Sequence, residues 1–399
     1  MSRQATNVPF THEPGTEGSI ELSIVMPCLN EAPTIGTCVR KAQASLARLG
    51  IQGEVVVADN GSTDGSREIA AELGVRVVPA AARGYGNALA AGIASARGRY
   101  VIMGDADDSY DFADLGPIVE RLRAGHDLVV GNRFSGGIRP GSMPWLHEHL
   151  GNPVLSFIGR RLFGTPCGDI YCGLRGFDRE KVTALDLRSA GMEFAIEMVV
   201  KATMQNLRIA EVPTVLSPDA EGRQPHLKTW RDGWRSLRLL LLYSPRWLFL
   251  YPGIVLFAVG IAGMALLLPT QRTIADVTFD VSTLLYAAVA VVVGLQAIFF
   301  FVTARWFGMT QGLLPEDERV GRLVDAHLLE LGLLAGLALT AAGLGLSVYA
   351  LATWNEQGFG QLDYPDILRL VIPGATLITC GMQTVFSSMF LGVIGLKRP

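Results

Sequence analysis

Two aspartates separated by a single alanine, Asp105 and Asp107, follow the apolar run of residues 100–103. Side chains two residues apart in an extended chain point to the same side, so we expect the two carboxylates to converge just past a strand end. Carboxylates brought together repel each other, and a hard divalent cation relieves that repulsion. Because Mg²⁺ completes its shell with substrate phosphates, the pair predicts a metal site for a phosphorylated donor.

Three other polar or glycine-rich turns precede this one. They are residues 27–31 (PCLNE), 59–66 (DNGSTDGS) and 83–87 (RGYGN). Each one alone is typical of an ordinary turn or helix cap, for example through Asp64 or Ser66. Four successive turns rich in carboxylates and glycines favour a ligand site instead. No GxGxxG follows the first apolar run, which argues against a Rossmann dehydrogenase.

Short β-branched runs alternate with helical patterns around these turns. The predicted strands are 22–26, 55–58, 75–78, 100–103 and 128–130, and the predicted helices are about 34–49, 66–73, 87–96 and 115–123. This alternation predicts a doubly wound α/β sheet, in which ligands bind outside the carboxyl ends of the strands. The four turns would therefore share one rim.

The later part of the chain has four long stretches without a charged residue, at 247–271, 281–304, 331–355 and 370–396. Each exceeds the ~20 residues that cross a ~30 Å hydrocarbon core, so we predict four transmembrane helices. Arginines and lysines precede the first stretch, lie between the second and third, and follow the fourth. We therefore expect a multi-pass protein of the inner (plasma) membrane. The positive-inside rule predicts that its N-terminal domain and its C-terminus lie in the cytoplasm.

The composition agrees with this division. Of 399 residues, 49% are hydrophobic and 18% are charged, with a net charge of −3 and a mean hydropathy of +0.32. These values exclude a disordered or nucleic-acid-binding chain. Five scattered cysteines without CxxC spacing indicate neither a disulfide framework nor a zinc site. The first twenty residues lack the apolar core of a signal peptide.

The motifs carry a resemblance to a known family. In order, LSIVMPCLNEAPTI, VVVADNGSTDGS, GYGNALAAGI and YVIMGDADDSYDF resemble a family 2 glycosyltransferase of the GT-A fold. The later segments GNRF (131–134), DIYCGLRGFDRE (169–180), GMEFAIEMVVKA (191–202) and EVPTVLSPDAEGRQPHLK (211–228) resemble the dolichol-phosphate mannose synthase and polyprenyl-phosphate glycosyltransferase branch. The resemblance implies inverting transfer of one hexose from a UDP- or GDP-sugar to a polyprenyl phosphate.

The resemblance also implies donor-binding residues. The matches to contacts with the base and ribose are Pro27, Asn30, Glu31 and Asp59. Asp64, in the second turn, is a further candidate. Asp105 and Ala106 match donor contacts, and Asp107 matches the principal ligand of a Mg²⁺ or Mn²⁺ ion. Ser109 stands where the second metal-side residue is often Gln, and Asp108 is a candidate to compensate for it.

The acceptor in this branch is a phosphate monoester, which is mostly dianionic at pH 7 and already a nucleophile. A general base is therefore less necessary than charge neutralisation by a metal and by guanidinium groups. We assign this work to the basic residues Arg133, Arg175, Arg223 and Lys228. Asp169 matches a carboxylate proposed as a base in this branch, or else it orients Arg175 or the sugar.

Two segments are predicted to lie beside the lipid. Residues 227–246 alternate arginines with tryptophans and leucines, a pattern typical of an interfacial helix, although a plain linker would also fit. Residues 145–163 are predicted to form an amphipathic helix on the acceptor side. We therefore expect a flexible segment 1–19, a catalytic domain 20–226, an interfacial helix 227–246 and a membrane domain 247–399.

Other functions stay open. A processive polysaccharide synthase would carry a QxxRW signature, which this chain lacks. A glycosyltransferase with another lipid acceptor, a nucleotidyltransferase and a catalytically idle sugar-nucleotide sensor share the same features. The sequence leaves the sugar, the base of the donor and a homo-oligomeric state undecided.

Overall fold

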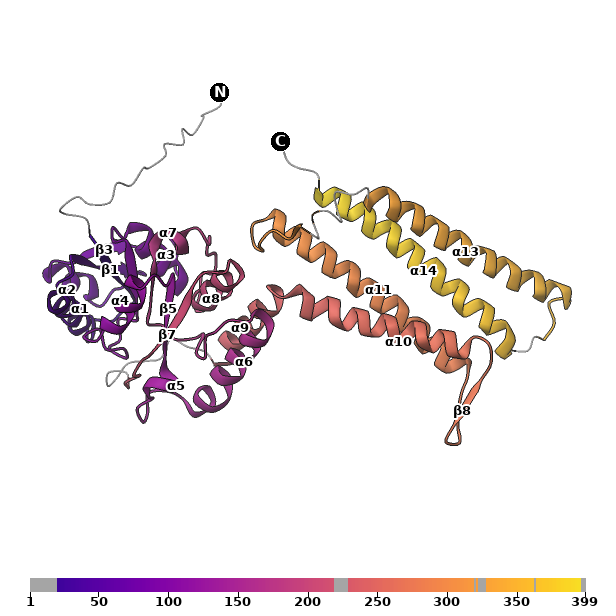
Figure 1. Cartoon of the computed structure of the whole chain (residues 1–399), viewed down its shortest axis with the longest axis horizontal. Helices are drawn as coiled ribbons and strands as arrows, with labels where there is room; N and C mark the ends of the chain where they lie inside the picture. The colour runs from indigo at the N-terminus through magenta and orange to yellow at the C-terminus, as the bar shows by residue number, and fades with distance from the viewer. Residues whose placement is uncertain (1–19, 219–228, 319–320, 322–327, 362–363, 396–399) are drawn as a thin grey trace, which may run out of the picture. The chain divides into compact units, whose positions relative to one another are not determined.

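The computed structural model describes residues 20–218, 229–318, 321, 328–361 and 364–395. The chain divides after Leu239 into two compact units. The first is an α/β domain, drawn in indigo to magenta in Figure 1, and the second is helical and is drawn mainly in orange to yellow.

A seven-stranded sheet forms the centre of the first unit, with strand order β3-β2-β1-β4-β6-β5-β7. The strands are β1 (Leu22–Cys28), β2 (Gly53–Asp59), β3 (Arg76–Pro79), β4 (Tyr100–Met103), β5 (Leu128–Asn132), β6 (Arg175–Asp178) and β7 (Ile209–Pro213). The side chains of β1 are buried along its whole length, as expected for a strand covered on both faces.

The predicted α/β fold class is confirmed, but the sheet is mixed. Strand β6 lies between β4 and β5 and is antiparallel to both, whereas the other pairings are parallel. Sequence reasoning missed β6 and β7 because their segments, RGFD and IAEVP, lack a continuous apolar run.

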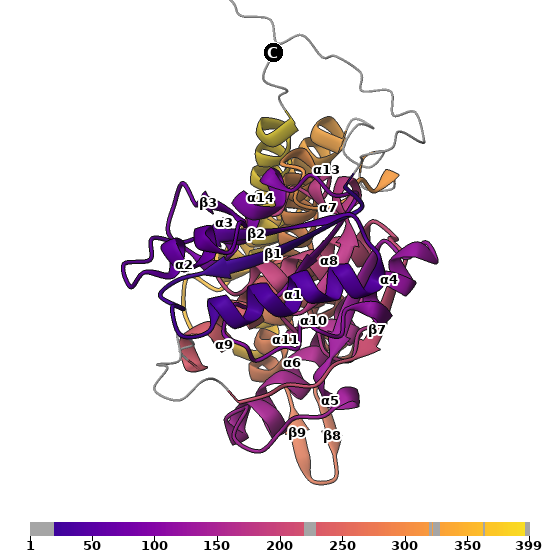
Figure 2. The same cartoon turned by 90° about the vertical axis from the view of Figure 1, so that its left-hand side faces the viewer.

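Helices cover both faces of the sheet, as Figure 2 shows. Helix α3 (Tyr85–Ser95) packs so closely on β1 that a side chain at Gly92 would collide with Val25. Helices α1 (Ile35–Leu49) and α4 (Gly116–Arg123) lie on the opposite face. The remaining helices of this unit are α2 (Ser66–Glu72), α5 (Arg133–Gly136), η1 (His147–Gly151), α6 (Asn152–Phe163), α7 (Arg179–Thr183), α8 (Phe194–Met204) and α9 (Thr229–Leu242).

Four helices among the described residues are long and apolar enough to cross a membrane, at Arg246–Leu267, Val281–Thr310, Leu329–Glu356 and Tyr364–Gly395. They correspond to η2 (Arg246–Leu250) with α10 (Tyr251–Leu267), α11 (Val281–Thr310), α13 (Leu328–Glu356) and α14 (Tyr364–Gly395). The four predicted spans are therefore present as helices. The first ends earlier than predicted, because Pro269 and the unforeseen hairpin β8 (Arg272–Ile274) to β9 (Val277–Phe279) follow it.

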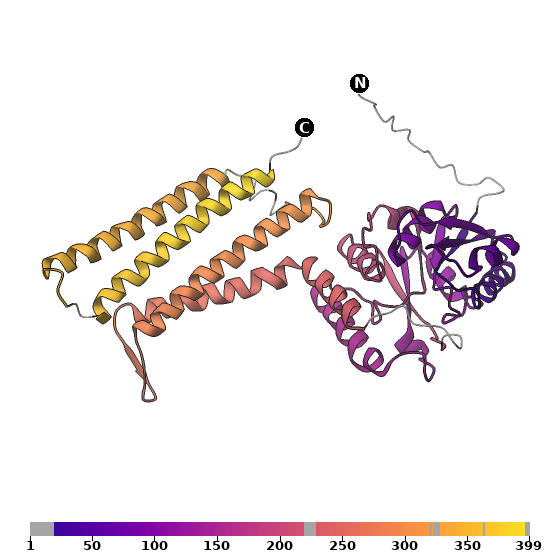
Figure 3. The ribbon, with the colours of Figure 1, turned by 180° about the vertical axis from the view of Figure 1, so that it is seen from behind.

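The membrane helices pack as two close pairs, α10 with α11 and α13 with α14 (Figure 3). Glycines line both seams. A Cβ atom on Gly260 would lie 2.6 Å from the backbone nitrogen of Val291, and one on Gly336 would lie 2.7 Å from the carbonyl oxygen of Gly381. The backbones therefore touch, which is a common way for helices to associate in lipid.

Candidate active site

The loops that follow β1 and β2 are joined to each other by hydrogen bonds. In each bond a backbone N–H of one loop donates to a side chain of the other. The bonds run from Asn30 N to Ser62 Oγ (3.0 Å), from Glu31 N to Ser66 Oγ (2.9 Å), from Ala32 N to Asp64 Oδ2 (2.9 Å) and from Thr63 N to Asn30 Oδ1 (2.9 Å). The first two predicted turns thus form a single rim, as expected.

The predicted donor-binding carboxylates on this rim also shape it. Asp59 is buried, and its two oxygens accept hydrogen bonds from the backbone N–H groups of Gly61 and Ser62, each at 3.1 Å. Burial acts to raise the pKa of Asp64, but the hydrogen bonds from Ser66 and Ala32 outweigh it and hold the pKa below its usual value. Both carboxylates therefore stabilise the turn, and their contact with a donor stays a prediction.

The third turn connects the second turn to the fourth. The backbone N–H of Gly84 donates to Asn60 Oδ1 at 2.9 Å, and its φ of 140° is a conformation that favours glycine. The next residue, Tyr85, donates its hydroxyl to Asp105 Oδ1 at 2.8 Å. All four predicted turns are therefore joined at the carboxyl edge of the sheet.

The acidic segment Asp105–Ala106–Asp107 lies in a turn after β4 and not in extended chain. The argument that alternate residues of a strand share a side therefore does not apply to it. Asp107 is buried, and its Oδ1 accepts from the hydroxyl of Ser109 at 2.6 Å. Ser109 thus orients Asp107, whereas Asp108 forms an ion pair at 2.7 Å with Lys41 on α1.

The donor set of this turn suits a hard cation that arrives with its substrate. Within the described residues, no group of three or more His, Cys, Asp or Glu side chains could hold a metal. Asp105 and Asp107 nevertheless supply carboxylate oxygens from one turn, and Mg²⁺ is typically held by one or two carboxylates together with substrate phosphates. The residues present therefore fit a divalent cation bound with a nucleotide diphosphate.

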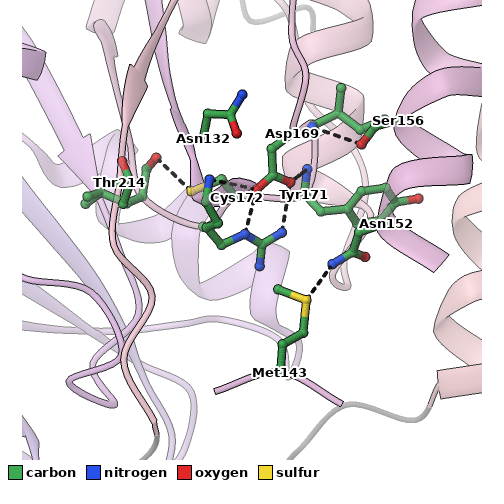
Figure 4. Close-up of polar contacts among 12 residues, drawn as sticks. Asn132, Met143, Asn152, Ser156, Asp169, Tyr171, Cys172 and Thr214 are labelled. Carbon is green, nitrogen blue, oxygen red and sulfur yellow. Dashed lines mark hydrogen bonds and ion pairs between the residues drawn. The ribbon is translucent and has the colours of Figure 1, made fainter. Parts of the chain in front are cut away.

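Arg133 and Asp169 form a buried ion pair, shown in Figure 4 around the labelled Asp169. Arg133 donates from Nε to Asp169 Oδ2 at 2.6 Å and from Nη2 to Oδ1 at 2.9 Å. Arg133 is 8% exposed and Asp169 is 0% exposed. Because this two-point contact uses Nε and Nη2, it leaves Nη1 directed away from the carboxylate. Burial opposes the charge of Arg133, but Tyr110 and the Asp169 carboxylate outweigh it and raise its pKa.

The geometry favours an orienting role for Asp169 over a general base. Its Oδ2 accepts from Nε and from the backbone N–H of Arg133. Its Oδ1 accepts from Nη2 of Arg133 and from the backbone N–H of Tyr171. A carboxylate offers about four lone-pair positions, and these bonds occupy them. The residue that Asp169 orients is Arg133, and not Arg175, which was one of the partners that the sequence left open.

Arg175 requires a correction. It is the first residue of β6 and is 0% exposed. Its guanidinium donates to the carbonyl oxygens of Ala195 at 2.6 Å, of Cys172 and of Ile170. Arg175 therefore supports the backbone inside the domain and does not reach a phosphate at the rim. The sequence did not predict strand β6, so it gave no sign that Arg175, the first residue of that strand, is buried.

Tyr110 links the acidic turn to Arg133. Its hydroxyl accepts from the backbone N–H of Gly173 at 2.9 Å, and a Cβ atom on Gly173 would lie 2.6 Å from Asp105 Oδ2. Burial is the main cause that raises the pKa of Tyr110. Cys172 and Asp105 raise this pKa further, whereas the charge of Arg133 acts to lower it. Asp105 and Arg133 thus both lie within electrostatic reach of one side chain.

A cavity of about 330 Å³ adjoins the ion pair. It is lined by Asn132, Phe134, Ser135, Pro153, Arg160 and Gly168. These residues come from the end of β5, from α5 and α6 and from the loop before Asp169. Two other predicted site residues, Arg223 and Lys228, lie outside the described residues.

Sequence reasoning did not assign Tyr85, Tyr110 or Glu211 to the site. Tyr85 lies within a turn that the sequence did single out, so its position was a usable signal. Nothing in the sequence indicated that Tyr110 and Glu211 contact loops that are more than forty residues away.

Each of the two segments predicted to lie beside the lipid contains a helix among its described residues. Within 227–246, α9 exposes Trp230 (83%) and Trp234 (59%). Within 145–163, the chain forms the π-helical turn η1 and then α6, with Trp145 (70%) and Phe157 (59%) exposed. Their location in the membrane interface stays a prediction.

Comparison with known proteins gives the class. Residues 23–185 match the family model "Glycosyl transferase family 2", and residues 302–395 match "Glycosyltransferase family 2 C-terminal transmembrane region". The mixed sheet with its four loops agrees with the GT-A fold that the motifs implied. The chain belongs to glycosyltransferase family 2 and has a transmembrane region, as the motifs indicated.

The matches to two relatives cover most of the length of each relative. The low-salt glycan biosynthesis hexosyltransferase Agl6 of Haloferax volcanii is 35% identical over 377 residues, which is 94% of this chain and 89% of Agl6. The dolichyl-phosphate hexose transferase of the same organism is 29% identical over 194 residues, 48% of this chain and 81% of that protein. The structure of glucosyl-3-phosphoglycerate synthase from Mycobacterium tuberculosis is 24% identical, with a TM-score of 0.45, over 58% of this chain and 85% of that one.

Proposed function

We propose that this glycosyltransferase transfers one hexose, with inversion, from a nucleotide sugar to the phosphate of a polyprenyl phosphate. The observation that carries the proposal is the Arg133–Asp169 pair, because a buried arginine held at two points by a carboxylate presents its remaining nitrogen in a defined direction. The names of two relatives, a hexosyltransferase and a dolichyl-phosphate hexose transferase, support the same substrate class.

The donor would lie against the four loops at the carboxyl edge of the sheet. Asp105 and Asp107 would hold Mg²⁺ or Mn²⁺ on its diphosphate. The metal, when bound, would neutralise the charge of the departing nucleoside diphosphate. Tyr85 and Ser109 keep these carboxylates in place through the bonds at 2.8 Å and 2.6 Å.

The acceptor phosphate would bind at Nη1 of Arg133. Its oxygen is a dianionic nucleophile near neutral pH, so no proton has to be removed before it attacks the anomeric carbon. This agrees with the four hydrogen bonds on Asp169, which leave it little capacity as a base. Arginine recruitment of one anion beside another offsets their repulsion.

In the same proposal, the α/β domain and the C-terminus lie in the cytoplasm, and α9 lies at the surface of the cytoplasmic leaflet. The exposed tryptophans of α9 and its arginines support this location, since such helices bind anionic interfaces. A lipid-borne phosphate would then reach the rim without leaving the headgroup region.

The test is a transfer assay with the full chain in nanodiscs, given labelled UDP-glucose, UDP-galactose or GDP-mannose and a polyprenyl phosphate. We expect label in the isoprenoid fraction together with release of nucleoside diphosphate. Polyprenol without phosphate serves as the matched control acceptor and should stay unlabelled. Release of hexose 1-phosphate, with the nucleotidyl group transferred to the acceptor, would indicate a nucleotidyltransferase, and absence of labelled isoprenoid with every donor would overturn the proposal.

A further inference from the structure

Glu211, on the edge strand β7, accepts three hydrogen bonds from two other segments of the chain. Its Oε1 accepts from the backbone N–H groups of Gly168 at 2.7 Å and of Asp169 at 3.1 Å. Its Oε2 accepts from Nδ2 of Asn132 at 3.2 Å. One carboxylate thus joins the end of β5, the loop before Asp169 and β7.

These bonds hold the backbone on both sides of the ion pair. Asn132 directly precedes Arg133 and caps α5, because its Oδ1 accepts from the backbone N–H of Ser135 at 3.0 Å. The Asp169 N–H that binds Glu211 belongs to the residue whose carboxylate binds Arg133. Glu211 therefore sets the distance between the two chain segments that carry the pair.

The packing at Gly168 shows how close this arrangement is. A Cβ atom there would lie 2.8 Å from Asn132 Nδ2 and 3.5 Å from Glu211 Oε2. On the other side of the loop, Nη1 of Arg160 donates to the carbonyl oxygen of Gly168 at 3.3 Å. The loop is thus held by two sets of contacts, and a side chain at Gly168 would push it away from Asn132.

From these contacts we infer that Glu211 is a positioning residue for the acceptor, which acts by holding Asn132 and the 168–169 loop so that Arg133 presents Nη1 in a constant direction. The inference rests on the proposed function, since it concerns the binding of the acceptor phosphate. The network around Glu211 is half-buried and charge-assisted, and such a network holds its geometry only while all its members are satisfied. Glu211 therefore affects acceptor use more than donor use.

The test is a double-mutant cycle of Glu211→Gln and Asn132→Asp in the full chain in nanodiscs. The first variant places an amide group opposite the Asn132 amide, and the second places two carboxylates opposite each other. The double variant restores donor and acceptor with the polarity reversed, and an aspartate at 132 still caps Ser135. We expect each single variant to lower kcat/KM for polyprenyl phosphate about tenfold, the scale of a lost hydrogen bond to a charged group, and the double variant to return to within about threefold of wild type.

Two readouts separate positioning from general stability. The KM for the nucleotide sugar should stay within about twofold of wild type in all variants. Glu54→Gln is the matched control, because Glu54 on β2 likewise binds a backbone N–H, that of Arg97 at 2.8 Å, and a side chain, Ser23 at 2.8 Å. It should lower Tm without changing acceptor kcat/KM.

The inference would be overturned by single variants with unchanged acceptor kcat/KM, or by a double variant as impaired as the product of the singles. Equal losses of donor and acceptor use would also overturn it, because they indicate a structural role alone. If wild type glycosylates no polyprenyl phosphate, the proposed function fails first. If wild type is active but the cycle shows no coupling, only the role of Glu211 fails.

Discussion

At the carboxyl edge of the sheet, neighbouring segments are joined by side chains that bind backbone groups, whereas along the membrane helices the backbones themselves touch. The loops after β1 and β2 share four such bonds, and Glu211, on the edge strand β7, accepts two more from the backbone of Gly168 and Asp169. In the second unit, Gly336 and Gly381 remove the side chains that would keep α13 and α14 apart.

The difference follows from the two solvents. In water, burial of the apolar sheet drives folding, so polar side chains on the loops are available to define the geometry of a site. In lipid, apolar burial gives no advantage to helix association, and close van der Waals contact between small residues takes its place. Substitution of a polar loop residue in the first unit should therefore disturb function, and substitution of a small residue in the second unit should disturb the packing of its helices.

The largest effect is expected at Asp107. Asp107→Ala should lower turnover by about 10³-fold with the fold retained, because a metal contributes several kcal/mol to catalysis and each 1.36 kcal/mol is tenfold in rate. The measurement is the transfer rate with Mg²⁺ or Mn²⁺, alongside circular dichroism. Asp108→Asn is the matched control and should cost less than tenfold, since Asp108 binds Lys41 on α1. Normal turnover in excess EDTA would contradict the metal assignment.

The second prediction concerns Glu197, a buried carboxylate of the first unit. It pairs with Lys201 at 2.8 Å and accepts from the backbone N–H of Ser189 at 2.8 Å. Breaking a buried pair costs about 3 kcal/mol, so Glu197→Gln should lower the unfolding free energy of this unit by about that amount. Exposed Glu120→Gln is the control and should leave stability nearly unchanged.

The same pair predicts a pH dependence. Burial acts to raise the pKa of Glu197, but hydrogen bonds from Lys201 and Ser189 and the Lys201 charge outweigh it and hold the pKa below 4.5. The carboxylate therefore stabilises the fold above about pH 4.5 and loses this contribution as pH falls through the lowered pKa. Denaturant unfolding of wild type should show this loss, and the Gln variant should lack it. If the unfolding free energy depended on pH equally in wild type and in Glu197→Gln, the lowered pKa would not belong to Glu197.

The membrane unit should respond to a single methyl group. A Cβ atom on Gly381 would lie 2.6 Å from the carbonyl oxygen of Gly336, whereas one on Gly345, on α13, would meet nothing within 4 Å. Overpacking typically costs about 1–3 kcal/mol. Gly381→Ala should thus lower thermal stability of the membrane unit in detergent, and Gly345→Ala should not. Identical melting of the two variants would contradict the glycine seam.

The smallest effect concerns Tyr85. Tyr85→Phe removes the hydroxyl that donates to Asp105 at 2.8 Å, a bond worth about 1.5 kcal/mol because its acceptor is charged. We expect kcat/KM for the nucleotide sugar to fall about tenfold and the metal concentration for half-maximal rate to rise. Tyr286→Phe, at an exposed position of α11, is the control. An unchanged metal requirement would show that Tyr85 does not position Asp105.

The sequence predicted those parts of the fold that local pattern determines. The runs that became β1 to β5 are apolar over several residues, and the four spans are long and without charge, so each could be recognised without knowledge of its neighbours. The extended geometry assigned to Asp105 and Asp107 was wrong, because β4 ends at Met103 and the chain turns there.

By itself the sequence determined the strands β1 to β5, the four long apolar helices, the order of the four polar turns and the family to which they belong. Only the tertiary structure decided which charged groups face each other. It buried Arg175 among carbonyl oxygens, paired Arg133 with Asp169, and brought Glu211 to Asn132 and to the backbone of residues 168–169. Arg133 lies 36 residues from Asp169 in the sequence, and Gly168 lies 43 residues from Glu211. These contacts depend on the antiparallel strand β6 and the edge strand β7, which no local pattern predicts.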